Sequence, residues 1–141
     1  MKTLFTILFF SIIPLTTFAA DCKKANEALP KSVMAANVFN QLYDFYGAYS
    51  SCLDGAIAET SAAIVTDAFA KNWKQLNSFN SLAMKDPKFK KFMLNSFEPN
   101  VTAQEGEVAQ IIKLARENCP QDLKSLCQEI KKACEKSLSS K

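Results

Sequence analysis

The fold class is decided by residues 123–138, whose sequence is LKSLCQEIKKACEKSL. The apolar residues of this stretch recur three, four or seven positions apart, and mostly lysine and glutamate fill the positions between them. That spacing puts the apolar side chains on one face of an α-helix. The face consists of Leu123, Leu126, Cys127, Ile130, Cys134 and Leu138. The stretch therefore predicts an amphipathic helix with two cysteines on its buried side.

The two segments upstream also have helical patterns. Thr102 and Glu105 have the spacing of a capping box and predict the start of a helix that ends before Pro120. Asp86-Pro87 is a favoured N-cap and first-turn pair, so a short helix is expected to follow it. The predicted inner face of the first helix is Val108, Ile111, Ile112, Ala115 and Cys119, and that of the short helix is Phe89, Phe92 and Met93, with Phe97 as a further candidate.

The first half of the chain is more apolar and has fewer helix-breaking residues. Apolar residues keep helical spacing from Phe39 to Leu76. We expect two helices, 31–48 and 52–78, with one long bent helix as the alternative. Residues 56–70 are apolar on nearly all sides, which predicts a segment in the centre of the molecule.

Composition supports an all-α fold. Glycine and proline are scarce, at three and five residues, and alternating β-branched runs are missing. About 120 residues follow the N-terminal segment, which is enough for one domain with its own core. We therefore predict a single-domain, disulfide-stapled bundle of about five helices over residues 20–141.

Residues 1–19 have the layout of a cleaved signal peptide. Lys2 precedes an apolar run from Leu4 to Leu15, and Thr17-Phe18-Ala19 provides small residues at −3 and −1 for cleavage. No later stretch has the roughly 20 apolar residues that a membrane span requires. The predicted location is periplasmic or secreted, with no transmembrane span in the mature chain.

The five cysteines are Cys22, Cys52, Cys119, Cys127 and Cys134. An odd number leaves one thiol over in an oxidising compartment. Cys127 and Cys134 are about 10.5 Å apart along one helix, too far for a bridge. Cys22 is the natural partner for one of them, and Cys52 can pair with Cys119 or Cys127 if the central helix packs on the C-terminal pair of helices. A Cys119–Cys127 bridge requires residues 120–122 to be non-helical. The remaining thiol is expected to be a small buried hydrophobe, and the alternatives are intermolecular pairing or a reactive thiol.

Charge and composition exclude several classes of function. The 17 basic and 14 acidic residues give a net charge of +3, or +2 after loss of Lys2, which is too balanced for a nucleic-acid binder. The absence of histidine removes Ser-His and Cys-His nucleophile pairs and ordinary zinc enzymes. We expect no cofactor, no metal and no enzyme activity. Asp54, Glu59 and Asp67 are the remaining catalytic candidates, as an acid and base at a glycosidic bond. The competing interpretation is capping, solvation or pairing, with Asp67 and Lys71 as a helical i,i+4 pair.

A group of lysines is the main candidate binding surface: Lys71, Lys74, Lys85, Lys88, Lys90 and Lys91. Aromatic residues lie between them in the sequence, so the group could form a basic, aromatic-edged surface for an acidic partner or anionic lipid. The competing interpretation is a solvated face whose aromatic side chains point inward.

Several short motifs resemble a family of small bacterial exported helical proteins. They are Cys52-Leu53-Asp54-Gly55-Ala56, Trp73, Asp86-Pro87-x-Phe89, Cys119-Pro120 and Leu126-Cys127, within residues 50–130. In size, signal peptide, helical content and cysteines the chain is also similar to periplasmic immunity proteins that neutralise type VI amidase effectors. This second resemblance is architectural and assigns no functional residue.

Three functions follow from these observations. We expect a protein-binding or inhibitor module, of immunity type, with an unidentified protein partner in the cell envelope. The first alternative is a carrier of a small apolar ligand in a closed pocket lined by Phe39, Phe45, Phe69 and Phe79. The second alternative is a hydrolase that uses the three carboxylates named above.

Overall fold

The computed structural model describes residues 21–98 and 104–140, and these residues are helical with no strand. They form seven α-helices, where the sequence predicted about five. The helices are α1 (Ala25–Ala28), α2 (Val38–Tyr49), α3 (Gly55–Lys71), α4 (Leu76–Lys85), α5 (Pro87–Asn95), α6 (Glu105–Glu117) and α7 (Lys124–Ser139). Four short 3-10 helices accompany them. One precedes α1 and the other three separate α-helices: η1 (Cys22–Lys24), η2 (Ser50–Cys52), η3 (Trp73–Gln75) and η4 (Gln121–Leu123). The all-α prediction is confirmed.

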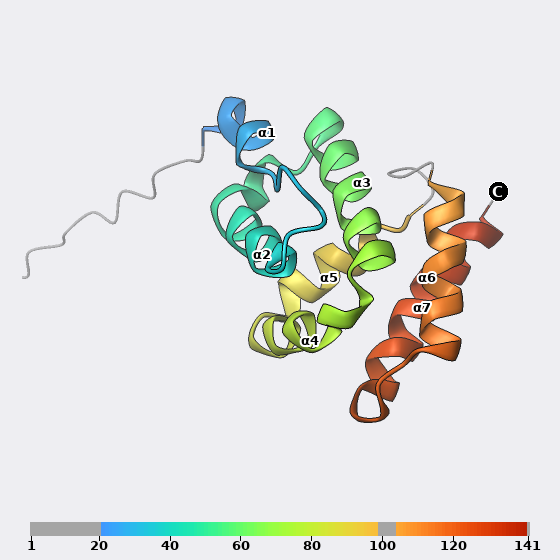
Figure 1. Cartoon of the computed structure of the whole chain (residues 1–141). Coiled ribbons are helices and arrows are strands. Elements are labelled where there is room, and N and C mark those ends of the chain that lie inside the picture. The colour runs from blue at the N-terminus through green and yellow to red at the C-terminus, as the bar shows by residue number, and fades with distance from the viewer. Residues whose placement is uncertain (1–20, 99–103, 141) are drawn as a thin grey trace, which may run out of the picture.

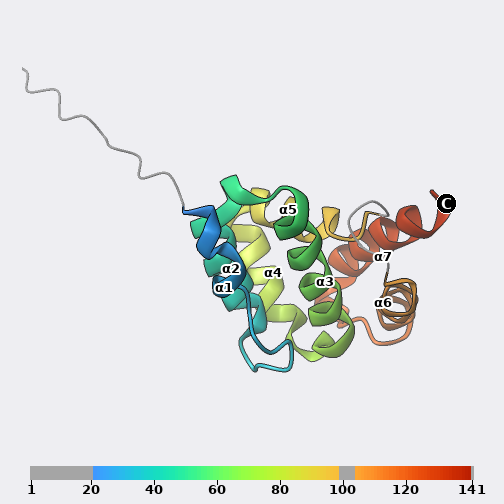
Figure 2. The same ribbon diagram turned by 90° about the horizontal axis from the view of Figure 1, so that it is seen from above.

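Helix α3 occupies the middle of the molecule (Figures 1 and 2). Helices α6 and α7 pack closely on each other, and α6 also packs against α3. Helices α2, α4 and α5 lie on the other side of α3 (Figure 1). This arrangement confirms the central position predicted for residues 56–70, although only the second half of α3, from Ser61 onward, contributes buried side chains.

An aromatic cluster fills the core around Phe69 of α3. Its ring lies 5.1 Å from that of Phe39, 5.0 Å from that of Phe79 and 5.4 Å from that of Phe97, centroid to centroid. All four side chains are fully buried. Tilted and edge-on ring pairs at these distances gain energy beyond the area that they bury. Phe69 thus joins α2, α4 and the segment after α5 to the central helix.

The predicted apolar faces of the later helices are largely correct. Asp86 caps α5, since its carboxylate accepts from the backbone amides of Lys88 and Phe89 at 2.9 and 3.1 Å. Phe89, Met93 and Phe97 are fully buried. The buried faces predicted for α6 and α7 are also confirmed, except at the ends of the two patterns, where Cys119 is only partly buried.

The exception in α7 is Leu138, which is 38% exposed. It lies in the last turn of α7, where the facing residues on α6 are Ala109 and Ile112. The small alanine leaves a surface groove between the two helices, so Leu138 is not covered.

The helices predicted for residues 31–48 and 52–78 are wrong at three of their four ends. Helix α2 begins only at Val38, because residues 31–37 form a loop whose carbonyls are bonded by side chains from elsewhere in the chain. Helix α3 begins at Gly55, whose φ of +45° is strained for any residue with a Cβ atom. It ends at Lys71, and a turn at residues 72–75 separates it from α4. The alternative of one long bent helix is excluded.

Two expectations cannot be compared with the structure. The predicted signal peptide, residues 1–19, and Thr102 of the predicted capping box lie outside the described residues. Within the described ranges, no helix combines the length and apolarity needed to cross a membrane.

Replacing Phe69 by alanine should lower the free energy of unfolding by about 3–5 kcal/mol, because it removes three ring contacts and leaves a cavity in the core. Urea unfolding followed by circular dichroism measures this loss. The control is Met84→Ala at a side chain that is 77% exposed, which should change stability by less than about 0.5 kcal/mol. Equal effects in the two variants would contradict the central role of Phe69.

Candidate functional site

The two disulfides lie outside the pairings that the sequence favoured. Cys22 pairs with Cys52, so its expected bond with Cys127 or Cys134 is wrong, and the possible bond from Cys52 to Cys119 or Cys127 is not formed. The reason is a small second core, in which Ala25, Leu29 and Phe45 pack beside Cys52. This packing brings the N-terminal segment against the end of α2 and places Cys22 next to η2.

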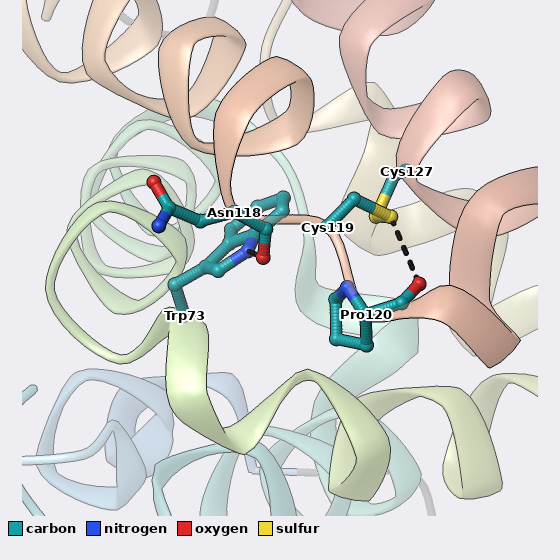
Figure 3. Close-up of a disulfide and its surroundings, with 5 residues drawn as sticks. All are labelled: Trp73, Asn118, Cys119, Pro120 and Cys127. Atoms are coloured by element: carbon teal, nitrogen blue, oxygen red, sulfur yellow. Dashed lines mark hydrogen bonds between the residues drawn. A yellow bond between two sulfur atoms is a disulfide. The ribbon is translucent and has the colours of Figure 1, made fainter.

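The second disulfide joins Cys119 and Cys127, the pairing that depended on a non-helical link. The link after Pro120 is a short 3-10 turn, and the Cα atoms of the two cysteines are 6.1 Å apart (Figure 3). Trp73 lies beside this turn, and its indole N–H donates to the carbonyl of Asn118 at 3.0 Å. The end of α6 is therefore held both to α7 and to the turn after α3.

Cys134 is the remaining thiol and is fully buried. Burial, with a smaller contribution from the charge of Glu135, raises the pKa of the thiol from its ordinary value of 9.0 to about 12. The group is thus an uncharged part of the core at neutral pH. This confirms the expectation of a buried thiol that acts as a small hydrophobe.

The three candidate catalytic carboxylates are not brought together. Asp54 and Glu59 are exposed, and Asp67 forms the predicted ion pair with Lys71 at 3.0 Å. Glu59 and Asp67 are about 12 Å apart along α3, too far to flank one glycosidic bond. Among the described residues, no three cysteine, aspartate or glutamate side chains are grouped as metal ligands would be. The arrangement gives no support to a carboxylate hydrolase.

The closed pocket predicted for an apolar ligand is also not formed. Phe39, Phe69 and Phe79 contact one another with centroids 5.0–5.6 Å apart, so their rings fill the space that the ligand would need. Phe45 belongs to the separate small core next to Cys52. In the described part of the chain, the four phenylalanines predicted to line this pocket thus serve packing and share no cavity.

The six candidate lysines are distributed over different surroundings. Lys71 and Lys74 line a pocket beside Trp73, and Lys85 lies over the ring of Tyr43, 5.5 Å from its centroid. Lys90 pairs with Glu129 of α7. Only Lys88 and Lys91 line the same groove as the aromatic residues Tyr46 and Phe92. Trp73, Phe79 and Phe89 are buried, as the competing interpretation expected, whereas Phe92 is only partly buried and lines this groove.

Sequence reasoning missed a surface loop that is held in place by side-chain hydrogen bonds from a distant part of the chain. Residues 29–37 contain no helix and run between α2 and α3 (Figure 1). The side-chain amide of Asn72 donates to the carbonyl of Val33, and that of Gln75 donates to the carbonyl of Ala35 at 3.1 Å. Gln75 also donates to the side-chain oxygen of Asn72 at 3.0 Å. We call residues 29–37, held in this way, the clamped loop.

A groove of about 580 Å³ lies between the clamped loop and α2. Leu29, Pro30 and Phe45 give it an apolar lining, and Phe45 stacks on Tyr49 with ring centroids 5.6 Å apart. Its polar lining residues are Lys31, Ser32, Gln41 and Asp44. An apolar lining with a few polar groups is typical of binding sites.

Met34 extends from the clamped loop with 66% of its surface exposed. Its backbone amide donates to the hydroxyl of Ser32 at 3.3 Å, which further shapes the loop. The only sequence signal for this site was Pro30, which disfavours helix at the preceding residue. The partners of the loop, Asn72 and Gln75, are about 40 positions away and gave no signal.

Comparison of the chain with protein-family models, curated proteins and solved structures finds no match. The candidate site therefore depends on its geometry alone.

Removing the Cys22–Cys52 bridge should destabilise the chain more than removing the Cys119–Cys127 bridge. The sequence separations are 30 and 8 residues, so chain entropy predicts losses of about 3.5 and about 2.5 kcal/mol. Each bridge contains one buried cysteine, which makes the paired Cys→Ala variants comparable. Urea unfolding of the two double variants measures the difference, and the reverse order would show that loop entropy does not control their stability.

The free energy of unfolding should fall between pH 9 and pH 12 because of Cys134. Above pH 9 the thiol ionises in the unfolded chain, while the folded chain keeps its proton until about pH 12. The native state is therefore favoured below pH 9, and this advantage is lost as the pH rises. A Cys134→Ala variant lacks this titration, so its decline over the same range should be smaller. Parallel pH profiles for the two proteins would contradict the raised pKa.

Proposed function

We propose that this chain is an exported protein-binding module that contacts a partner protein through the clamped loop and the groove beneath it. One observation carries the proposal: side chains at a distant helix junction hold an otherwise irregular surface loop in one conformation. Loops that are positioned by a rigid scaffold commonly carry binding function.

The placement of Asn72 supports a role for the loop beyond packing. Its side chain is only 7% exposed, and burying an amide is unfavourable unless its hydrogen bonds are made. The amide nitrogen of Asn72 donates to the carbonyl of Val33 in the loop, and its side-chain oxygen accepts from Gln75, the other residue that holds the loop. A loop fixed before binding loses less conformational entropy when a partner arrives, which increases affinity.

Export and an inhibitory role are parts of the same proposal. The N-terminal segment has the layout of a signal peptide, and two disulfides are expected of a chain that folds in an oxidising compartment. The architectural similarity to periplasmic immunity proteins suggests an envelope enzyme as the partner. In that case the loop would block access of substrate to the partner and would perform no chemistry.

The groove also supports one alternative, a carrier of a small apolar ligand. Its volume of about 580 Å³ is within the range of small-molecule sites, and Leu29, Phe45 and Tyr49 provide apolar surface. Such a ligand would contact the groove and would not require the exposed side chain of Met34. A change at Met34 therefore separates the two functions.

Replacing Met34 by glutamate should weaken capture of the partner at least tenfold, because it puts a charge on the most exposed apolar side chain of the loop. The matched control is Met84→Glu on α4, at a methionine that is 77% exposed and distant from the loop in sequence. Capture from an envelope extract, followed by titration with the purified partner, measures the affinities. Neither change affects a buried group, so both variants should fold.

Equal affinities of the Met34 and Met84 variants would exclude the loop as the contact surface. A second variant, Asn72→Ala, then tests whether the conformation of the loop matters, since it removes the bond to Val33 and keeps Met34. Absence of any protein partner, together with binding of an apolar probe such as a fatty acid in the groove, would favour the carrier.

A further inference from the structure

A second groove, on a different face of α2, has a basic edge. It has a volume of about 410 Å³ and lies between the end of α2, the start of α3 and α5. Tyr46 and Phe92 stack with centroids 5.1 Å apart at an interplanar angle of 24°, and Leu53 and Ala58 add apolar surface. Tyr46 is about 100° around α2 from Phe45, which lines the clamped-loop groove. We call this second site the basic groove.

Lys88, Lys91 and Asn95 form the α5 side of the basic groove and are all exposed. They are spaced by three and four residues, so they follow one face of the helix for about 10.5 Å. Within the described residues neither lysine has an acidic partner at ion-pair distance, whereas the neighbouring Lys90 pairs with Glu129. Among the described lining residues the only acidic one is Glu98, which is 3.9 Å from Lys136. The groove thus carries unbalanced positive charge.

The positions of these lysines are unfavourable for α5 itself. Lys88 is the second residue of the helix and Lys91 the fifth, and no acidic residue is present in the first turn. The positive end of the helix dipole disfavours cations there and favours aspartate or glutamate. Lysine in the first turn, as at Lys88, therefore does not stabilise α5 through its dipole, although the Asp86 cap supplies a negative charge at this end. An anionic ligand would be attracted by both lysines.

We propose that the basic groove binds an extended acidic segment of a partner protein. Carboxylates of the segment would pair with Lys88 and Lys91, and an adjacent aromatic or large aliphatic side chain would lie on Tyr46 and Phe92. Lys88 and Lys91 are about 4.5 Å apart along the axis of α5, so their long side chains can reach carboxylates on alternate residues of an extended chain, about 7 Å apart. The phenol of Tyr46 is neutral at neutral pH, and burial and the nearby Asp86 raise its pKa further above the ordinary value of 10.0.

Binding at the basic groove can be tested separately from binding at the clamped loop. The probe is the peptide acetyl-Glu-Phe-Glu-amide, with acetyl-Gln-Phe-Gln-amide as the uncharged control. Titration of the ¹⁵N-labelled mature chain should shift the backbone amides of residues 88–95 with the acidic peptide only. Added salt should weaken the binding because exposed charges are screened.

The double variant K88E/K91E should reduce affinity for the acidic peptide at least tenfold. It reverses both charges, yet glutamate near a helix N-terminus is favourable, so α5 should remain folded. The control variant is K113E, at an exposed lysine of α6 that lies outside both grooves. Its affinity for the peptide should equal that of the unchanged chain.

Three results would overturn the proposal. The first is absence of shifts at residues 88–95 with millimolar acidic peptide. The second is equal binding of the glutamine peptide or of the K88E/K91E variant. The third is retention of the chain by phosphatidylglycerol vesicles, dependent on Lys88 and Lys91, without binding of the peptide, which would assign the groove to anionic lipid. None of these results bears on the Met34 experiment, because the loop is unchanged in both lysine variants.

Discussion

The turn at the end of α3 is the constraint on which the rest of the structure depends. Asn72, Trp73 and Gln75 donate side-chain hydrogen bonds to carbonyls of Val33, Asn118 and Ala35, respectively. The carbonyls of Val33 and Ala35 lie about 40 residues before the turn, and the carbonyl of Asn118 lies 45 residues after Trp73. A single turn therefore fixes the clamped loop on one side and the end of α6 on the other. The aromatic cluster one turn earlier, around Phe69, keeps the turn itself in place.

The two disulfides hold different parts of the molecule, and only the second one reaches the main core, through Cys127. Cys22–Cys52 holds the N-terminal segment on a small second core, and Cys119–Cys127 holds the link between α6 and α7. The main core contains Cys127 of the second bridge and Cys134, whose thiol is free. The same N-terminal segment leads into the clamped loop, so the first bridge and the hydrogen bonds of Asn72 and Gln75 restrain the candidate site from its two ends.

Local patterns predicted the parts of the fold that local forces determine. The apolar stripes of α6 and α7 and the Asp86-Pro87 start of α5 could be recognised because their spacing and capping lie within a few residues. Residues 31–37 also have acceptable helical composition, yet amides from another part of the chain hold them as a loop. The pairing of Cys22 with Cys52 likewise depends on packing of Leu29 and Phe45. Of the six candidate lysines, sequence could not show that only Lys88 and Lys91 line a groove together with Tyr46 and Phe92.

The position of Cys134 on α7 has a consequence for the assembly of the chain. Once α7 is helical, Cys134 is two turns from Cys127 and cannot reach it, and packing against α6 then buries the thiol. Oxidation that follows helix formation therefore leaves four cysteines able to pair, and η4 holds Cys119 beside Cys127. Oxidation of the extended chain meets five, with fifteen ways to form two bonds. Helix formation before oxidation thus reduces the number of incorrect pairings that are open to the chain.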